Sequence, residues 1–358
     1  MRRVVALLRA TVLATVLATV LAALLAGCGS SSGGGGGSGG ELVVSGFSFG
    51  AQDFQRTVIE PFQKQTGIKV SFEPGSNSDR YNKLLVNKAR PDTDVVLMSD
   101  VFARQGEQQG LFTKIDPASL PNLAQTVGFA RSSGGMGVPY TFTLLGMLYS
   151  TQTFGKTPPT VAALWDPKFA GKIALPDISA TAGVPFLMAV AQTFGSGPTD
   201  MATAFTKLAE LKPHVLQFYS STTELLSLLQ RGEIVAAPGL DLFAYGAVAG
   251  GSPIGWAPLD TGKFLSYNEA EIVAGSPNPK AAATFVNYLL SAEAESATAK
   301  AFYDKPVNRG ATVPPIVAQV SGGAAKDPGA AGFVPIDLNF VAQHRAEWID
   351  EFARRVSG

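Results

Sequence analysis

The chain of 358 residues has few of the side chains that catalytic and metal sites usually require. It contains one cysteine and two histidines, and no cluster of His, Cys, Asp and Glu has the spacing of metal ligands. It also lacks a phosphate-binding loop of the GxxxxGK type. These absences argue against metal-dependent chemistry and nucleotide binding, and no cofactor is predicted.

Charge is also scarce and balanced. Charged residues make up 16% of the chain, with 28 basic and 28 acidic residues and a formal net charge of zero. A protein that binds nucleic acid typically carries a basic excess, so no nucleic-acid partner is predicted.

What the sequence does have is a long apolar run at its start. A basic head (MRR) precedes this run, which ends in LAGC at residues 25–28. The pattern is typical of a secretory signal with a lipobox, in which Cys28 receives diacylglycerol after cleavage. We therefore predict a lipoprotein signal peptide over residues 1–27. The alternative is a transmembrane anchor, but Arg9 interrupts the run and leaves it short for a span.

Residues 29–40 are only Gly and Ser, which is typical of a flexible linker. Lipidated Cys28 and this linker (28–40) would tether the protein to the outer face of the cytoplasmic membrane, in the periplasmic space or at the cell surface. Cleavage would remove three of the 28 basic residues, leaving 25 against 28 acidic residues and a formal charge of −3. The remaining chain, roughly 318 residues, is long enough for two hydrophobic cores.

Strand and helix patterns alternate along residues 41–358, which predicts an α/β fold with parallel strands. The expected strands are at residues 43–46, 68–72, 94–98, 172–176, 215–219, 234–237 and 254–257. Helices are expected between them, including one at 102–109 and one that begins near Thr181.

Two extended stretches, 137–149 and 263–274, are too long for a single lobe, and we interpret them as crossover strands between two lobes. Lobe 1 would comprise residues 41–140 and 270–358, and lobe 2 residues 141–269. The C-terminal helices, including the one that holds Trp348, are expected to return to lobe 1. Nothing in the pattern favours an oligomer, so a monomer is predicted.

Residues 46–50 read GFSFG and match the nucleophile elbow of serine hydrolases, with Ser48 as the nucleophile. Asp241 and His344 follow in the order that such enzymes use. However, the motif follows the first strand of the mature chain, so no earlier strand and loop can supply a second oxyanion donor. His344 also stands at helical spacing beside Trp348, as a packed side chain would. We predict that the protein is not an enzyme, and serine esterase is kept as the alternative from another class.

Aromatic and small polar residues recur where the predicted strands end, which is where ligands bind in open α/β sheets. Two such lobes that face each other would bring these residues into one cleft. The candidate ligand-binding residues are Phe47, Phe49, Ser99, Asp100, Tyr140, Thr141, Ser179, Thr181, Asp241, Tyr267 and Asn268.

Several of these residues also have a purely structural interpretation. Asp177 and Asp100 precede helices and would cap them. Ser179 and Thr181 either cap the same helix start or present N–H groups to an anion. In the same structural interpretation, Phe47 and Phe49 are ordinary core residues. Asp241 is the strongest ligand candidate, because an acid between apolar residues at a strand end otherwise requires a capping role.

Four segments resemble the extracellular solute-binding proteins of bacteria. They are FQKQTGIKV at 62–70, DVVL at 94–97 followed by GLFTKID at 110–116, LWDPKFAGKIALPD at 164–177, and PVN at 306–308. The nearest branch looks like the polyamine, thiamine, ferric-ion and phosphonate receptors of ABC importers. The resemblance implies a two-lobed, type II periplasmic-binding-protein fold whose crossover strands form the hinge. It also implies that the protein delivers one solute to the permease and ATPase subunits of an importer.

The ligand expected from the resemblance is a small polar organic solute, namely an amine such as spermidine or putrescine, or a thiamine-like cation. Asp100 and Asp241 would pair with its positive group, and the aromatic residues would line the cleft. The chain departs from the polyamine pattern, since residues 177–181 hold one acid rather than two and Asn268 stands where those receptors have an acid. The paired tyrosines of ferric receptors are also not matched. A phosphonate, carboxylate or ferric ligand is the alternative, with an anion at Ser179 and Thr181.

Overall fold

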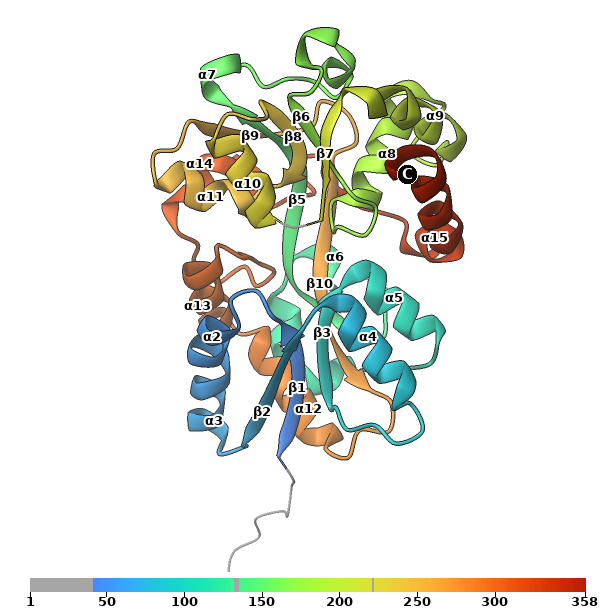
Figure 1. Cartoon of the computed structure of the whole chain (residues 1–358). Helices are drawn as coiled ribbons and strands as arrows, with labels where there is room; N and C mark the ends of the chain where they lie inside the picture. The colour runs from blue at the N-terminus through green and yellow to red at the C-terminus, as the bar shows by residue number, and fades with distance from the viewer. Residues whose placement is uncertain (1–40, 132–134, 221) are drawn as a thin grey trace, which may run out of the picture. The chain divides into compact units, whose positions relative to one another are not determined.

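A mixed sheet of 12 strands forms the centre of the protein, and its main path runs in the order β2-β1-β3-β10-β5-β8-β6-β7 (Figure 1). The structure is a computed structural model, and it describes residues 41–131, 135–220 and 222–358. The predicted signal peptide, Cys28 and the Gly/Ser linker lie outside the described residues.

The sheet has two halves joined by two long strands. The strands of the first half are β1 (Leu42–Phe47), β2 (Val70–Gly75), β3 (Val95–Ser99) and β4 (Phe112–Thr113). Those of the second half are β6 (Ile173–Pro176), β7 (Val215–Tyr219), β8 (Ala236–Leu240) and β9 (Ile254–Pro258). The joining strands are β5 (Val138–Ser150) and β10 (Phe264–Val273), and the short strands β11 (Lys305–Pro306) and β12 (Val334–Pro335) pair with them.

Helices cover this sheet on both sides. Those that follow the strands of the first half are α2 (Ala51–Phe54), α3 (Glu60–Thr66), α4 (Asn77–Val86), α5 (Asp100–Gln108) and α6 (Gly128–Arg131). Those of the second half are α7 (Thr151–Phe154), α8 (Gly183–Phe194), α9 (Met201–Leu211), α10 (Thr222–Gln230) and α11 (Leu242–Ala249). The C-terminal part adds α12 (Pro279–Leu289), α13 (Ala292–Phe302), α14 (Pro315–Ser321) and α15 (Leu338–Phe352), which continues into a π-helical turn, η8 (Ala353–Ser357).

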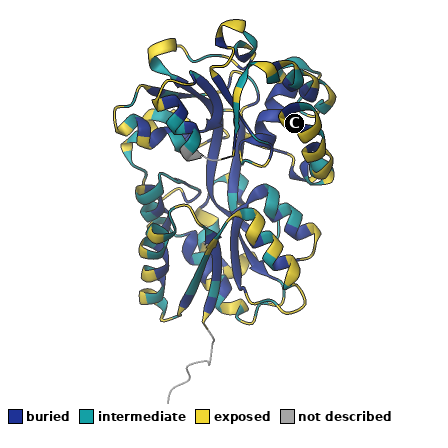
Figure 2. Cartoon of the chain, in the orientation of Figure 1, coloured by how far each residue is buried: buried dark blue, intermediate teal, exposed yellow. Residues whose placement is uncertain are grey.

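Strand direction follows the prediction. Within each half, the strands that follow one another pair in parallel, β1 with β2 and β3, and β6 with β7 and β8. The joining strands β5 and β10 are antiparallel to each other and to β8 and β3, respectively, whereas the short strand β12 pairs with β10 in parallel. Both are buried along nearly their whole length (Figure 2). The two-lobed α/β fold with two crossover strands, predicted from the long extended stretches, is confirmed.

The C-terminal helices follow only in part the expectation that they return to lobe 1. α12 and α13 pack against the first half, but Ser321 at the end of α14 bonds to Tyr245 of α11 in the second half. The Phe352 ring of α15 lies 5.6 Å from the ring of Phe218 on β7. Arg355 of η8 donates to the Thr206 hydroxyl at 3.0 Å. The physical reason is that α15 is divided between the halves: the helix packs on α5 of the first half, whereas its C-terminal end and η8 pack on the second half.

Candidate functional site

A cavity lies where the carboxyl end of β3 faces the carboxyl end of β6. Its empty volume, including the opening to solvent, is about 330 Å³. The first half contributes Asn77 at the start of α4 and residues 99–102 at the start of α5. The second half contributes residues 178–181 and 184, and α15 contributes Arg345.

The structure brings four of the predicted ligand residues together here: Ser99, Asp100, Ser179 and Thr181. Ser99 and Asp100 come from the first half, whereas Ser179 and Thr181 come from the second. They are more than 75 residues apart in the sequence. The rule that ligand groups gather at the carboxyl ends of parallel strands is sufficient to place all four.

Asp100 is almost fully buried and its carboxylate already has backbone partners. Oδ1 accepts from the N–H of Val101 at 2.8 Å and Oδ2 from the N–H of Tyr267 at 3.2 Å. Burial raises the pKa of Asp100 to about 7, and these two backbone hydrogen bonds oppose the shift. The carboxyl group therefore fixes the start of α5 against β10, as the capping interpretation expected.

Asp177 does not cap a helix as the sequence suggested, because α8 begins at Gly183 with Ala182 as its N-cap. Its Oδ1 accepts from the backbone N–H of Ser179 at 2.8 Å and from the Ser179 hydroxyl at 2.6 Å. This orders the turn between β6 and α8, and it leaves Thr181 exposed at the cavity with no side-chain hydrogen bond to another described residue.

Arg345 is a cavity residue that the sequence analysis missed. Its guanidinium carbon lies 4.9 Å from the centre of the Phe102 ring, and its Nε is buried without a hydrogen-bond partner. Burial lowers its pKa, which the nearby Tyr81 partly offsets. A signal existed in the sequence: Arg345 falls on the same helical stripe as the buried Val341 and Trp348, where a cation is unusual.

The remaining candidates at the crossover strands lie deeper. Tyr140, Thr141 and Tyr267 are buried, and Tyr267 lines a second hollow of about 740 Å³ together with Arg104, Phe129 and residues 335–339. Burial raises the pKa values of Tyr140 and Tyr267. Asn268 is partly buried, and it pairs with Ser99 on one side and Thr141 on the other, beside a bulge in β10. These residues therefore belong to the joining strands between the halves and do not line the first cavity.

The two phenylalanines of the GFSFG segment have different environments. The Phe47 ring packs under the guanidinium of the buried Arg80, at 4.2 Å, whereas Phe49 is 72% exposed. Arg80 also donates to the carbonyls of Gly46 and Gly75, at 2.7 Å for Gly75, and thereby ties the ends of β1 and β2 together. Neither phenylalanine lines the cavity.

The elbow does not assemble a catalytic triad among the described residues. Ser48 is exposed in the turn after β1. The His344 ring stacks on Trp348, and its Nδ1 lies 3.7 Å from Glu347. His344 thus has the packed role that its helical spacing suggested, and Asp241 is engaged elsewhere.

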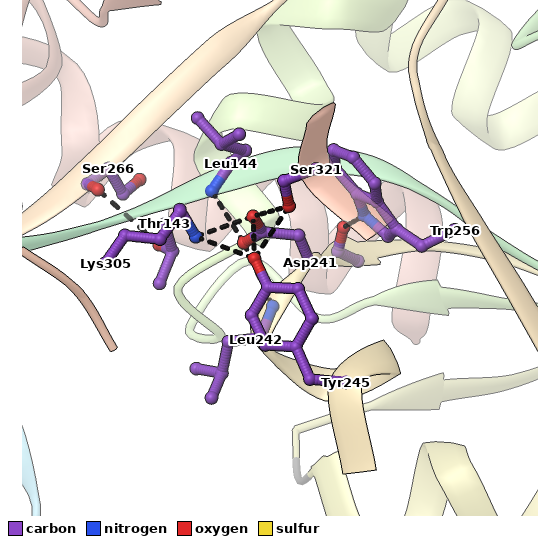
Figure 3. Close-up of polar contacts among 10 residues, drawn as sticks. Thr143, Leu144, Asp241, Leu242, Tyr245, Trp256, Ser266, Lys305 and Ser321 are labelled. Carbon is purple, nitrogen blue, oxygen red and sulfur yellow. Dashed lines mark hydrogen bonds and ion pairs between the residues drawn. The ribbon is translucent and has the colours of Figure 1, made fainter. Parts of the chain in front are cut away.

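Asp241 lies at the centre of a fully buried polar network (Figure 3). Its Oδ1 accepts from the backbone N–H groups of Leu144 at 3.0 Å and Leu242 at 2.9 Å. Its Oδ2 accepts from three side chains, namely Tyr245 at 2.6 Å, Ser321 at 2.7 Å and the ammonium of Lys305 at 2.6 Å. Lys305 is itself fully buried. Both oxygens are therefore occupied by the protein, which disagrees with the expectation that Asp241 pairs with a ligand cation.

A second buried charge cluster lies behind the cavity. Glu269 and Glu271 of β10 are buried beside Glu107 and Arg104 of α5, which form an ion pair at 2.6 Å. Burial raises the pKa values of Glu269 and Glu271, and repulsion from neighbouring carboxylates adds to the shift. Asp100 is one of those neighbours, so the cluster extends to the wall of the cavity.

The direction of this shift determines its effect on stability. Unfolded glutamates titrate at about 4.3. Between that pH and the raised folded values, the native state binds more protons than the unfolded state, so the free energy of unfolding falls as the pH rises.

Two features are absent from the described residues. No group of three or more His, Cys, Asp and Glu among them is placed to hold a metal ion. None of the described helices has the length and apolar character needed to cross a bilayer.

Comparison with known proteins identifies the family. The family model of bacterial extracellular solute-binding proteins matches residues 57–325. The spermidine/putrescine-binding periplasmic protein 1 of Haemophilus influenzae is 26% identical over 243 residues, 65% of this chain and 66% of that protein. The putative 2-aminoethylphosphonate-binding periplasmic protein of Salmonella typhimurium is 22% identical over 276 residues, 75% of this chain and 78% of that protein.

The fold agrees with this match. A crystal structure of an ABC transporter from Clostridium perfringens superposes with a TM-score of 0.76 at 30% identity, covering 88% of this chain and 100% of that chain. The family match includes both joining strands and the cavity walls formed by α4, α5 and the β6–α8 turn. The chain therefore belongs to the bacterial extracellular solute-binding proteins, as a substrate-binding protein of an ABC transporter.

Proposed function

We propose that the protein captures one small polar organic solute in the cavity between β3–α5 and β6–α8, and delivers it to the permease and ATPase of an importer. The observation that carries this proposal is the composition of the cavity, which takes walls from both halves of the sheet. A solute bound there would contact both lobes at once and favour their approach. The hinge would be the middle of β5 and β10, the only long strands that the halves share within the described part of the chain.

The site of action follows from the start of the sequence. A signal over residues 1–27 and a lipid on Cys28 would hold the solute-binding part at the outer face of the cytoplasmic membrane. The Gly/Ser linker of residues 28–40 would allow this part, as a monomer, to reach the permease.

Two solute classes follow from the relatives, since one is named for polyamines and another for an aminophosphonate. The amine class was first expected to use Asp100 and Asp241. Their oxygens accept hydrogen bonds from the protein, and Asp241 also has its own buried lysine. This geometry favours solutes with an acidic group over simple polyamines.

An amine solute remains the second candidate because of Asp304. This residue is partly exposed and has no hydrogen bond or ion pair to another described residue. Burial raises its pKa to about 6, although Lys305 opposes the shift. Tyr303 before it ends α13 as a left-handed C-cap with a φ of 61°. Loss of amine binding in Asp304→Asn would support this candidate.

Thermal shift with a solute panel tests the proposal. The full chain would be titrated with polyamines, thiamine, amino acids, phosphonates and carboxylates, because a ligand that binds only the folded state raises the melting temperature with dose. Thr181→Trp places a large ring at the exposed rim of the cavity and should abolish the shift. Val86→Trp, at an exposed position of α4, is the matched control. A shift that survives Thr181→Trp would place the solute elsewhere and contradict the proposal.

A further inference from the structure

We propose that the solute carries an anionic head group, a carboxylate or a phosphonate, and that Arg345 of α15 binds it in the cavity. This inference rests on the proposed function, because it names the chemistry of the solute held at that site. Arg345 would then be the residue that determines specificity.

The first argument is that Arg345 is charged and has no counter-charge within the described part of the chain. Arginine stays protonated in proteins, so its cation persists despite partial burial. Among the described residues no carboxylate lies within ion-pair distance of it, and its buried Nε has no hydrogen-bond partner. The Phe102 ring attracts the guanidinium but supplies no negative charge, and a ligand anion would supply it.

The other donors at the cavity are the second argument. Asn77 Oδ1 accepts from Arg80 Nη2 at 2.8 Å and from the Ser99 N–H at 3.2 Å, which leaves its Nδ2 to donate. The hydroxyls of Ser99 and Thr181 have no hydrogen bond to another described residue. Three donors thus accompany one guanidinium, whose planar fork can donate two hydrogen bonds to two oxygens of a carboxylate or phosphonate.

The acids at the cavity do not compete for Arg345. Asp100 uses both oxygens on backbone N–H groups, and Asp177 holds Ser179. Because burial raises the pKa of Asp100 to about 7, its negative charge is partly neutralised near neutral pH. An anion can therefore approach Arg345 without the repulsion of a fully charged Asp100.

The position of Arg345 between the two halves is the third argument. It projects from a helix whose C-terminal end packs on the second half, while its guanidinium lies against Phe102 of the first half. An anion bound to Arg345 would therefore link α15 to both walls of the cavity.

Calorimetric titration of the full chain with butylphosphonate, valerate and butylamine tests this inference. We expect the two acids to bind the wild type. Arg345→Gln should weaken their binding about 30- to 1,000-fold, because a charged partner of the anion is removed. Arg345→Lys keeps the charge but loses the fork, so about tenfold weaker binding is expected. Arg354→Gln is the control. It also removes one positive charge, but from an exposed residue of η8, the turn into which α15 continues.

Melting temperatures of the variants would show whether each one folds. If Arg345→Gln does not fold, Arg345→Lys still tests the inference. If butylamine binds, the acids do not, and Thr181→Trp removes butylamine binding, the anionic head group is wrong while the importer role stands. If the acids bind but neither Thr181→Trp nor Arg345→Gln weakens them, the cavity is not the solute site and both proposals fail.

Discussion

The buried pair between Asp241 and Lys305 predicts a large loss of stability when its charge is removed from one side. Asp241→Asn keeps one oxygen that can accept from the N–H groups of Leu144 and Leu242, but its amide nitrogen replaces the oxygen that accepts from Lys305, Tyr245 and Ser321. The fully buried ammonium of Lys305, 2.6 Å from the carboxylate, would then lose its ion-pair partner and keep only the attraction of Asp304.

The structure sets the magnitude of this effect. Removing one partner of a buried ion pair typically costs about 3–5 kcal/mol of unfolding free energy, because the other charge stays desolvated. Burial already lowers the pKa of Lys305, and Asp241 opposes that shift. Without Asp241 the lysine can lose its proton, which limits the cost, so we expect the lower end of this range.

Urea unfolding of the full chain, followed by tryptophan fluorescence, measures the effect as a double-mutant cycle with Lys305→Met. The double variant has no buried charge and should be more stable than Asp241→Asn, with a coupling energy of about 2 kcal/mol. Lys207→Met, which breaks a more exposed pair with Glu210, is the control and should change stability by less than about 1 kcal/mol. If Asp241→Asn costs no more than this control, the network does not stabilise the second half as described.

Three further predictions follow from other parts of the chain. Because the pKa values of Glu269 and Glu271 are raised, the melting temperature should be higher near ~pH 5 than near ~pH 8, and Glu269→Gln should reduce this difference; a rise in stability toward pH 8 would contradict the assignment. Cys28→Ala should move the protein from the membrane fraction to the soluble fraction and abolish labelling by a palmitate analogue. A fluorophosphonate probe should leave Ser48 unlabelled, whereas labelling that Ser48→Ala removes would revive the esterase alternative.

The strand pattern predicted the architecture well for a physical reason. Parallel strands that are covered on both faces are continuous apolar runs, and residues 94–98 match the fully buried β3 closely. The two long extended stretches likewise match β5 and β10, because a strand that crosses between two lobes is longer than one lobe requires. Residues at strand ends were predictable for the same reason, and four of them line the cavity.

Packing between distant segments was not predictable from these local patterns. Asp241 was placed in the ligand cleft because nothing near it in the sequence shows that Lys305 and Ser321 lie beside it. The path of α15 depends on which lobe buries its apolar stripe, and both lobes offer apolar surface. Arg345 therefore reached the cavity from a helix that had been assigned to lobe 1.

Hydrogen–deuterium exchange with and without a solute from the thermal-shift panel tests the central claim most directly. A solute held between the halves should slow exchange at residues 99–102 and 178–184 together, since these segments form opposite walls of one cavity. Protection of both segments at the same solute concentration is the predicted result. Protection confined to one half, or to a surface away from both segments, would contradict the account.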